Sequence, residues 1–94
     1  MASLHIEHPI TDLNTWFSAY TAFGDARRNA GVLKETVRRP DDEPHYIVVD
    51  LEFDTNEHAH AFLEFLRTNI WSSPATSPAL DGTPNAKVLN TINL

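Results

Sequence analysis

Residues 48–66 read VVDLEFDTNEHAHAFLEFL, and they decide the fold because an alternating pattern gives way to a helical one inside this stretch. Apolar residues at alternate positions predict a strand over Tyr46–Phe53. From Ala59 the apolar residues recur every three or four positions, which predicts an amphipathic helix that continues to Ile70. Asp54 and Glu57 have the spacing of a capping box, which predicts where that helix begins.

A β-hairpin precedes this helix. Residues 32–39 alternate well enough to predict a strand, and their charges are typical of a sheet edge. Residues 40–44 read PDDEP, which is the composition of a turn, and they connect this strand to Tyr46–Phe53. The two strands are therefore predicted to pair.

The N-terminal part of the chain predicts another strand and another helix. Leu4–Pro9 alternates in hydropathy and ends at a proline. Asp12 is a favourable N-cap for the helix that follows. That helix carries an apolar stripe formed by Leu13, Trp16, Phe17, Tyr20 and Phe23. Gly24 and Asp25 predict a break or a bend, and Gly31 predicts the end of the helix.

The predicted elements follow the order βαββαβ in one domain over residues 1–94. Ser72–Asn85 is rich in serine, proline and threonine, which predicts a long loop. Ala86–Leu94 then alternates in hydropathy, which predicts a last strand. The β-α-β order occurs twice, as in a split βαβ unit. Right-handed crossovers place the first and third strands side by side in the centre of the sheet, parallel to one another, with the other two strands at the edges.

The composition predicts a folded cytoplasmic protein without a nucleic-acid or membrane partner. Hydrophobic residues make up 41% of the chain and charged residues 21%, which is ordinary for a globular domain. The net charge of −6 opposes binding to a phosphate backbone, and the sequence contains no apolar run long enough to cross a bilayer. Cysteine is absent, which fits a reducing compartment, and the N-terminus lacks the pattern of a signal peptide.

The predicted sheet has one apolar and one polar face. The apolar face, which fits the stripes of both helices, carries Leu4, Ile6, Ile47, Val49, Leu51 and Phe53. The opposite face carries His5, Glu7, Lys34, Arg38, Tyr46, Val48, Asp50 and Glu52. Such a face is either solvated, as one side of an antiparallel sheet often is, or forms a polar dimer interface in which Lys34 and Arg38 pair with acidic residues.

The order of elements and several motifs resemble the dimeric α+β barrel superfamily, which includes antibiotic-biosynthesis-type monooxygenases, polyketide cyclases and haem-degrading enzymes. The motifs are the aromatic first helix, the Pro/Asp turn, residues 48–66, and the WSSP sequence at residues 71–74. The chain looks most like the small actinobacterial members. The resemblance implies an α+β, ferredoxin-like fold in which an antiparallel four-stranded sheet has two helices on one face. It also implies a homodimer through the sheet face and a pocket between sheet and helices.

His8 is the candidate for proton transfer. It ends the first strand on the side that faces the helices, where haem-degrading members of the superfamily place a pocket-lining asparagine. A histidine has an unperturbed pKa of about 6.5 and can act as a general base near neutral pH. The alternative is a structural histidine that is bonded to backbone or water.

Aromatic residues predict the walls of the pocket. Trp16 and Tyr20 lie on the stripe that faces the sheet, and the hydroxyl of Tyr20 makes it the second catalytic candidate. Phe62, Trp71 and His58 complete the predicted ligand-binding set with Trp16. Structural alternatives are core packing for Trp16 and anchoring of the following loop for Trp71.

The sequence argues against a metal site and against haem. Glu57, His58 and His60 cluster, but residues two apart on a helix point in different directions, whereas zinc-binding helices place their histidines four apart. Haem-degrading relatives need an iron-ligating histidine after the tryptophan that Trp71 resembles, and no histidine follows His60. We therefore expect no metal and no cofactor.

Two functions remain open from the sequence. One is a pocket protein for a small apolar or aromatic molecule, acting as a cofactor-independent monooxygenase or cyclase on an aromatic or polyketide-like compound. The other is a non-catalytic dimeric binding or structural module whose pocket is filled by its own side chains. The second predicts no cavity of about 300 Å³ or more, the smallest that encloses a drug-sized ligand.

Overall fold

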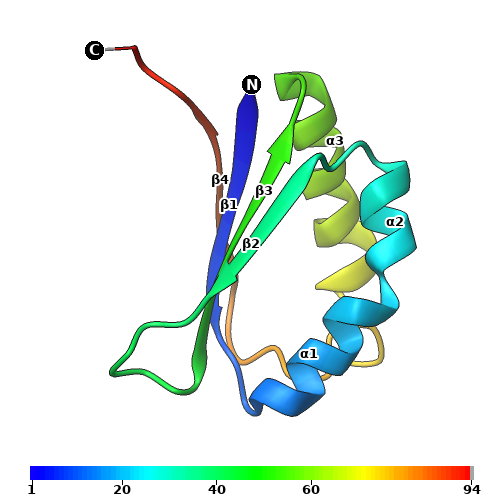
Figure 1. Cartoon of the computed structure of the whole chain (residues 1–94). Helices are drawn as coiled ribbons and strands as arrows, with labels where there is room; N and C mark the ends of the chain where they lie inside the picture. The colour runs from blue at the N-terminus through cyan, green and yellow to red at the C-terminus, as the bar shows by residue number, and fades with distance from the viewer. Residues whose placement is uncertain (94) are drawn as a thin grey trace.

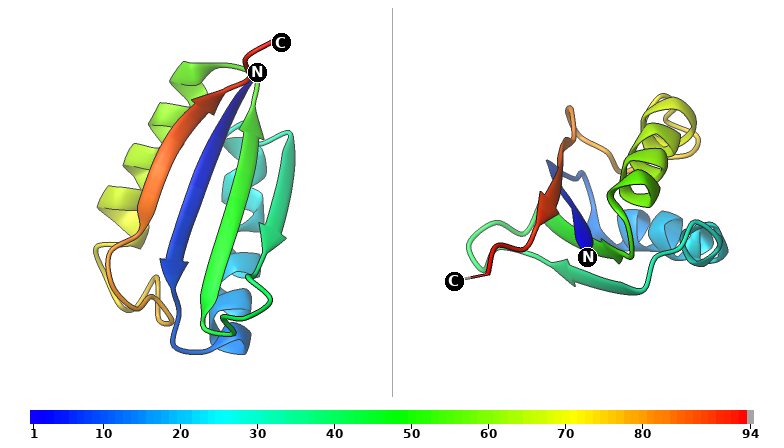
Figure 2. Two further views of the ribbon diagram at one scale, coloured as in Figure 1. Left: turned by 90° about the vertical axis from the view of Figure 1, so that its left-hand side faces the viewer. Right: turned by 90° about the horizontal axis from the view of Figure 1, so that it is seen from above.

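The computed structural model describes residues 1–93 as a four-stranded sheet with helices on one side (Figure 1). The strands are β1 (Ala2–Pro9), β2 (Lys34–Arg38), β3 (Tyr46–Phe53) and β4 (Asn85–Asn90). The helices are α1 (Leu13–Ala22), α2 (Gly24–Asn29) and α3 (Asn56–Phe65), and α3 continues into the π-helical turn η1 (Leu66–Ile70). Figure 2 shows the helices on the same side of the sheet when it is viewed from above. The predicted βαββαβ order is confirmed, with the first helix divided in two.

The strands lie in the order β2-β3-β1-β4, and every neighbouring pair is antiparallel. β1 and β3 pair along their whole length, from Ala2 opposite Phe53 to Pro9 opposite Tyr46. The prediction that these two strands are parallel is therefore wrong. The helical crossover returns the chain to β2, which runs parallel to β1, and the hairpin then turns β3 back between them.

Alternation along the two central strands builds the core. Leu4, Leu51 and Phe53 are at most 1% exposed, and each points toward the helices. They pack with Ala59 and Phe62 of α3 in one continuous cluster. The predicted apolar face of the sheet is confirmed.

The helix ends follow local side-chain hydrogen bonds. α1 begins as predicted, because the Asp12 carboxylate accepts the backbone N–H of Thr15 at 2.8 Å. For α3 the predicted capping box is wrong: the N-cap is Thr55, whose hydroxyl accepts the backbone N–H of His58 at 3.1 Å. The carboxylate of Asp54 is bound instead to the His58 side chain.

Two predictions from glycines are confirmed. The first helix breaks next to Gly24, and α2 ends just before Gly31. Phe23 has φ −98° and ψ 17°, outside the helical region, so α1 ends before it and α2 starts at Gly24. Gly31 has φ 98°, a conformation that favours glycine, and it follows α2 as a C-terminal stop.

Two predicted strands are shorter in the structure. β4 ends at Asn90 because Asn90 pairs with Ala2, the first residue of β1, so Thr91 has no strand beside it. Leu94, the predicted end of this strand, lies outside the described residues. β2 begins at Lys34 because the Val32 N–H still bonds the Arg27 carbonyl of the preceding helix. Among the described helices, none has the length and hydropathy to cross a bilayer.

Substitutions of Phe17 and Phe53 test which aromatic side chains belong to the core. The sequence places both in apolar stripes, but Phe17 is 53% exposed at the margin of the α1 stripe whereas Phe53 is fully buried. We expect Phe53→Ala to lower the free energy of unfolding by about 3–5 kcal/mol. Phe17→Ala should lower it by less than about 1 kcal/mol, since little packing is lost. Urea denaturation measures both, and equal losses would contradict the arrangement of α1.

Candidate functional site

A partly open cavity of about 90 Å³ lies between the sheet and the helices, where the sequence predicts a pocket. β1 and β3 form its floor, and α1, α2, α3, η1 and the loop before β4 form its walls. Most of its lining is apolar, including Ile6, Val49, Leu51 and Phe65. Water inside it would meet few polar partners, so the cavity suits an apolar group better than a solvent molecule.

The cavity brings together all but one of the predicted site residues. Its lining includes His8, Trp16, Tyr20, Phe62 and Trp71. The exception is His58, whose side chain is 55% exposed and bound to Asp54 at 2.6 Å between Nδ1 and Oδ1. The structure places His58 outside this cavity, in an adjoining hollow of about 260 Å³ that it lines together with Phe62 and Phe65, which also line the cavity.

His8 lies in the cavity wall with a defined tautomer. The residue is 4% exposed, and its Nδ1 donates to the Pro9 carbonyl oxygen at 2.9 Å. Burial lowers the pKa of the His8 imidazole, so the ring is neutral at pH 7. With the proton on Nδ1, the lone pair is on Nε2. Nε2 has no hydrogen-bond partner among residues 1–93. Every fully buried side-chain nitrogen in that range has one, so Nε2 is not fully buried.

Tyr20 contributes its ring to the cavity, and its hydroxyl is hydrogen-bonded elsewhere. The ring stacks on Trp16 with 4.8 Å between centroids. The hydroxyl donates to Oε1 of Glu35 on β2 at 2.9 Å, and burial raises the pKa of Tyr20 well above its usual value. The phenol is therefore protonated at neutral pH, and its ring, which lies between Trp16 and the Arg27 guanidinium, meets the cavity with its edge.

Arg27 also lines the cavity, and sequence reasoning missed it. It is 6% exposed, and its Nε donates to Oε2 of Glu35 at 3.1 Å. Its NH1 donates to the Tyr20 carbonyl oxygen at 2.5 Å, and its Cζ lies 3.6 Å from the centroid of the Tyr20 ring. The available signal was periodicity: position 27 continues the helical spacing of Trp16 and Tyr20 past the break at Gly24.

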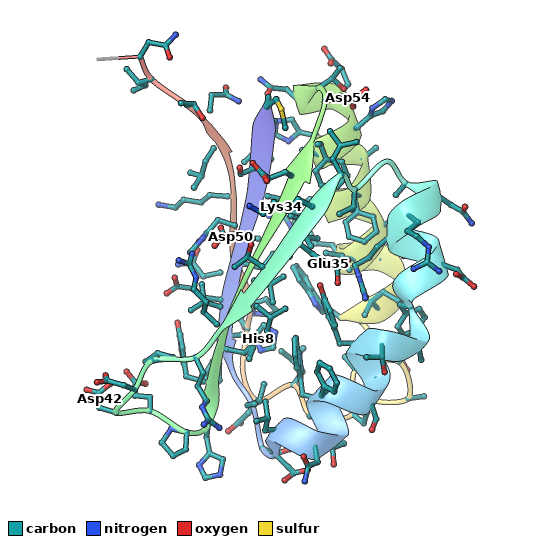
Figure 3. All side chains as sticks on the ribbon, in the orientation of Figure 1. His8, Lys34, Glu35, Asp42, Asp50 and Asp54 are labelled. Carbon is teal, nitrogen blue, oxygen red and sulfur yellow. The ribbon has the colours of Figure 1, made fainter. Side chains whose placement is uncertain are left out.

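The sheet face opposite the helices carries a hydrogen-bonded network of charges. His5 Nδ1 lies 2.7 Å from Oδ1 of Asp50, and Nε2 lies 2.9 Å from Oε2 of Glu7. Arg38 donates to the second oxygen of Asp50 at 2.7 Å, and Tyr46 donates to Glu7 at 2.8 Å. Figure 3 shows Asp50 on this face and Glu35 on the side of the helices.

This network sets the charge of His5 and its neighbour. Hydrogen bonding to Glu7, together with Asp50, raises the pKa of His5 above the usual value, and the bond from His5 lowers the pKa of Glu7.

A groove of about 420 Å³ runs along the same face beside Lys34, Arg38, Asp50 and Glu52. Within residues 1–93, no three histidine or carboxylate side chains are grouped closely enough to hold a metal ion.

No protein-family model and no curated protein matches the sequence. Solved structures do match. An antibiotic biosynthesis monooxygenase superposes with a TM-score of 0.70 at 10% identity, over 99% of this chain and 100% of its own. The chain shares the fold of that protein. At this identity the likeness is one of fold, and it confirms the ferredoxin-like architecture expected from the sequence.

Two further structures extend the comparison. A dimeric ferredoxin-like protein from an uncultured marine organism has a TM-score of 0.64 at 11% identity, over 100% of this chain and 97% of its own. A monooxygenase from Streptomyces coelicolor, solved with nanaomycin D, has a TM-score of 0.62 at 15% identity, over 99% of this chain and 88% of its own. Proteins with this ferredoxin-like fold thus include dimers and named monooxygenases.

The two histidines of β1 should have pKa values on opposite sides of the usual value for histidine. In an NMR titration of the imidazole protons, we expect the pKa of His5 above about 6.5 and that of His8 below it. The same titration in concentrated urea should bring both values together. The reverse order in the folded protein would contradict the environments described here.

The two shifts make opposite contributions to stability. The contribution of His8 is present above its unfolded pKa and is lost as the pH falls toward its lower folded value. The contribution of His5 is present below its unfolded pKa and is lost as the pH rises through its higher folded value. His5→Gln should therefore abolish the fall in the free energy of unfolding at alkaline pH and keep the fall at acidic pH. Urea denaturation across the pH range measures both.

Proposed function

We propose that the protein binds a small molecule with an aromatic part in the cavity and acts on it as a cofactor-independent monooxygenase or cyclase. The observation that supports this most directly is the neutral imidazole of His8 in a lining that is otherwise mostly apolar. A buried base with a free lone pair is a feature of sites that remove a proton from a bound molecule.

The proposed step is proton transfer to Nε2 of His8. The Pro9 carbonyl holds the Nδ1 proton and thereby fixes both the tautomer and the orientation of the ring. An acidic O–H or C–H of an aromatic compound would give its proton to Nε2, leaving an electron-rich anion that can react with dioxygen or cyclise. Trp16, which lines the cavity, would be the aromatic partner of such a compound, because the faces of the Tyr20 ring are covered by Trp16 and Arg27.

The comparisons support this proposal as far as fold analogy can. Two of the three structures described above are named monooxygenases, and one of those was solved with nanaomycin D. Because common folds carry unrelated chemistries, the argument for this chain rests on His8 and the cavity.

The size of the cavity favours a second candidate function. Its 90 Å³ is below the roughly 300 Å³ that encloses a drug-sized molecule. This is the result expected of a non-catalytic dimeric module whose pocket is filled by its own side chains. A polycyclic ligand would need the helices to move away from the sheet.

Under either function, we propose that the free sheet face binds a second copy of the chain. The face carries both signs of charge, with Lys34 and Arg38 near Asp50 and Glu52. Two copies related by a twofold axis can therefore place basic groups against acidic ones. Two structures with this fold are named as dimeric ferredoxin-like proteins, which supports a dimer of this chain.

Native mass spectrometry of freshly purified protein tests the first function. We expect a dimer that carries additional small-molecule mass, lost under denaturing conditions. His8→Gln should lower the occupancy about tenfold or more, because the bound molecule loses its partner at Nε2. His60→Gln is the matched control, since His60 is exposed on α3 and lines neither the cavity nor the hollow beside it, and it should keep full occupancy. Unchanged occupancy in His8→Gln would contradict the role of His8, and dimers free of added mass would favour the non-catalytic module.

Charge reversal tests the dimer. Lys34→Glu should weaken dimerisation by about tenfold or more, because it places like charges together at the proposed interface. Arg67→Glu makes the same change in net charge on the exposed side of the η1 turn and should leave the dimer intact. Analytical ultracentrifugation measures both dissociation constants. Equal dimerisation in the two variants, or a monomeric parent protein, would contradict an interface on this face.

A further inference from the structure

The cavity beside His8 is too small to hold a ring-bearing molecule by itself. It measures about 90 Å³, whereas an apolar cavity of about 150 Å³ binds one benzene ring. The adjoining hollow that His58 lines measures about 260 Å³. Taken together, the two spaces reach the roughly 300 Å³ that encloses a drug-sized molecule. A ligand of that size therefore has to occupy both.

One face of α3 forms the first wall of the hollow. His58 and Phe65 are seven positions apart, so they lie on the same face of the helix. Ala61 and Phe62 lie between them on that face, and all four residues line the hollow. These side chains therefore form one continuous wall, which is apolar except for the imidazole of His58.

The opposite wall of the hollow comes from α2 and the turn that follows it. Ala26 and Ala30 line the hollow there. No Cα atom of α2 lies within 8 Å of one in α3, whereas helices in direct contact have axes about 8–10 Å apart and Cα atoms that come closer. Because alanine side chains are too short to fill such a gap, an apolar groove stays open between the two helices.

Phe62 and Phe65 lie at the boundary between the hollow and the cavity, because both residues line both spaces. Phe62 is buried, and the centroids of the two rings are 5.8 Å apart. Phe65 is 36% exposed, so its ring can turn toward solvent by a change of rotamer, which exposed side chains make on the nanosecond timescale. Rotation of Phe65 is therefore the motion that joins the hollow to the cavity.

His58 supplies the polar group of the hollow. Its Nδ1 donates to the Asp54 carboxylate at 2.6 Å, so the lone pair of the neutral ring is on Nε2. Nε2 of His58 has no hydrogen-bond partner within residues 1–93. A molecule in the hollow therefore meets apolar side chains and one acceptor to which it can donate a hydrogen bond.

We propose that the ligand site extends past Phe65 into the hollow. The ligand is an elongated molecule with its reacting end in the cavity beside His8. Its far end is an apolar ring that lies in the hollow and carries an O–H or N–H group that donates to Nε2 of His58. This rests on the proposed small-molecule function and specifies the shape and the second end of that molecule. His58 is then a binding residue, and Phe65 determines how far the ligand extends.

Substitution of Ala61 tests the role of the hollow. Phenol is the probe, and an NMR titration follows the methyl signal of Ala30, which lines the hollow and does not line the cavity. Ala61→Leu adds a larger side chain at an exposed helical position, so it should keep the fold and weaken phenol binding about tenfold or more. His60→Leu adds the same side chain on α3 outside both spaces and should leave the affinity unchanged.

A second pair of variants tests the hydrogen bond to His58. Toluene has nearly the shape of phenol but no donor. His58→Phe keeps a ring and removes the acceptor, so the ratio of phenol affinity to toluene affinity should fall about threefold or more, the size of one hydrogen bond. His60→Phe should leave that ratio unchanged. An unchanged ratio in His58→Phe would contradict the role of His58.

Native mass spectrometry tests whether the hollow and the cavity hold one molecule. We expect Ala61→Leu to lower the occupancy by the co-purified molecule about tenfold, as His8→Gln does. Full occupancy in Ala61→Leu, together with loss in His8→Gln, would overturn this inference and leave the proposed function intact.

Three other outcomes are also decisive. Equal phenol binding by Ala61→Leu and the parent protein would overturn the inference. A weaker dimer in Ala61→Leu, measured by analytical ultracentrifugation, would overturn it as well, because the hollow would then be a contact between proteins. If phenol leaves the Ala30 signal unshifted and the purified protein carries no added mass, both the extended site and the proposed small-molecule function are wrong.

Discussion

The antiparallel register between β1 and β3 is the constraint on which the rest of the structure depends. Opposing residues, such as Leu4 with Leu51 and Ile6 with Val49, point to the same face of the sheet. A slip of one residue would turn this whole set toward solvent, so burial of the core specifies the register strongly. The same register that forms the core therefore also assigns every polar residue of these strands to a face.

His5 and His8 show what this assignment achieves. They are three positions apart on β1, so one faces the helices and the other faces away. His8 lies among apolar groups with one backbone partner, and its neutral form is favoured. His5 lies between Glu7 and Asp50, and its charged form is favoured. One short strand thus carries a candidate base on one face and part of a candidate interface on the other.

Features that depend on neighbours in sequence were predictable, and features that depend on tertiary contacts were not. Alternation in Tyr46–Phe53 and the spacing of Trp16 and Tyr20 predicted the elements and much of the cavity wall. The direction of β3 was mistaken because it follows from how the helical crossover and the hairpin combine. Helical spacing places position 27 on the same side as Trp16 and Tyr20, but burial of a charged side chain there depends on Glu35 of β2, which bonds Arg27 and is distant in the sequence.

Smaller errors had a similar origin. Asp54 is as good an N-cap residue as Thr55, but in the structure Thr55 caps the helix and the Asp54 carboxylate binds the side chain of His58. His58 is thereby held outside the cavity. Phe17 belongs to an apolar stripe by spacing, but only the part of the stripe nearest Trp16 and Tyr20 meets the sheet.

The helices around the cavity are attached to the sheet in different ways. α3 is anchored by Ala59, Phe62 and Leu63, which are buried, whereas α1 contributes no fully buried residue. α1 is held mainly through partly buried rings and the bond from Tyr20 to Glu35. Local opening on the α1 side exposes no fully buried residue of that helix, so it has a lower free-energy cost than opening on the α3 side. We therefore expect the cavity's contents to exchange with solvent past α1, while α3 keeps the core intact.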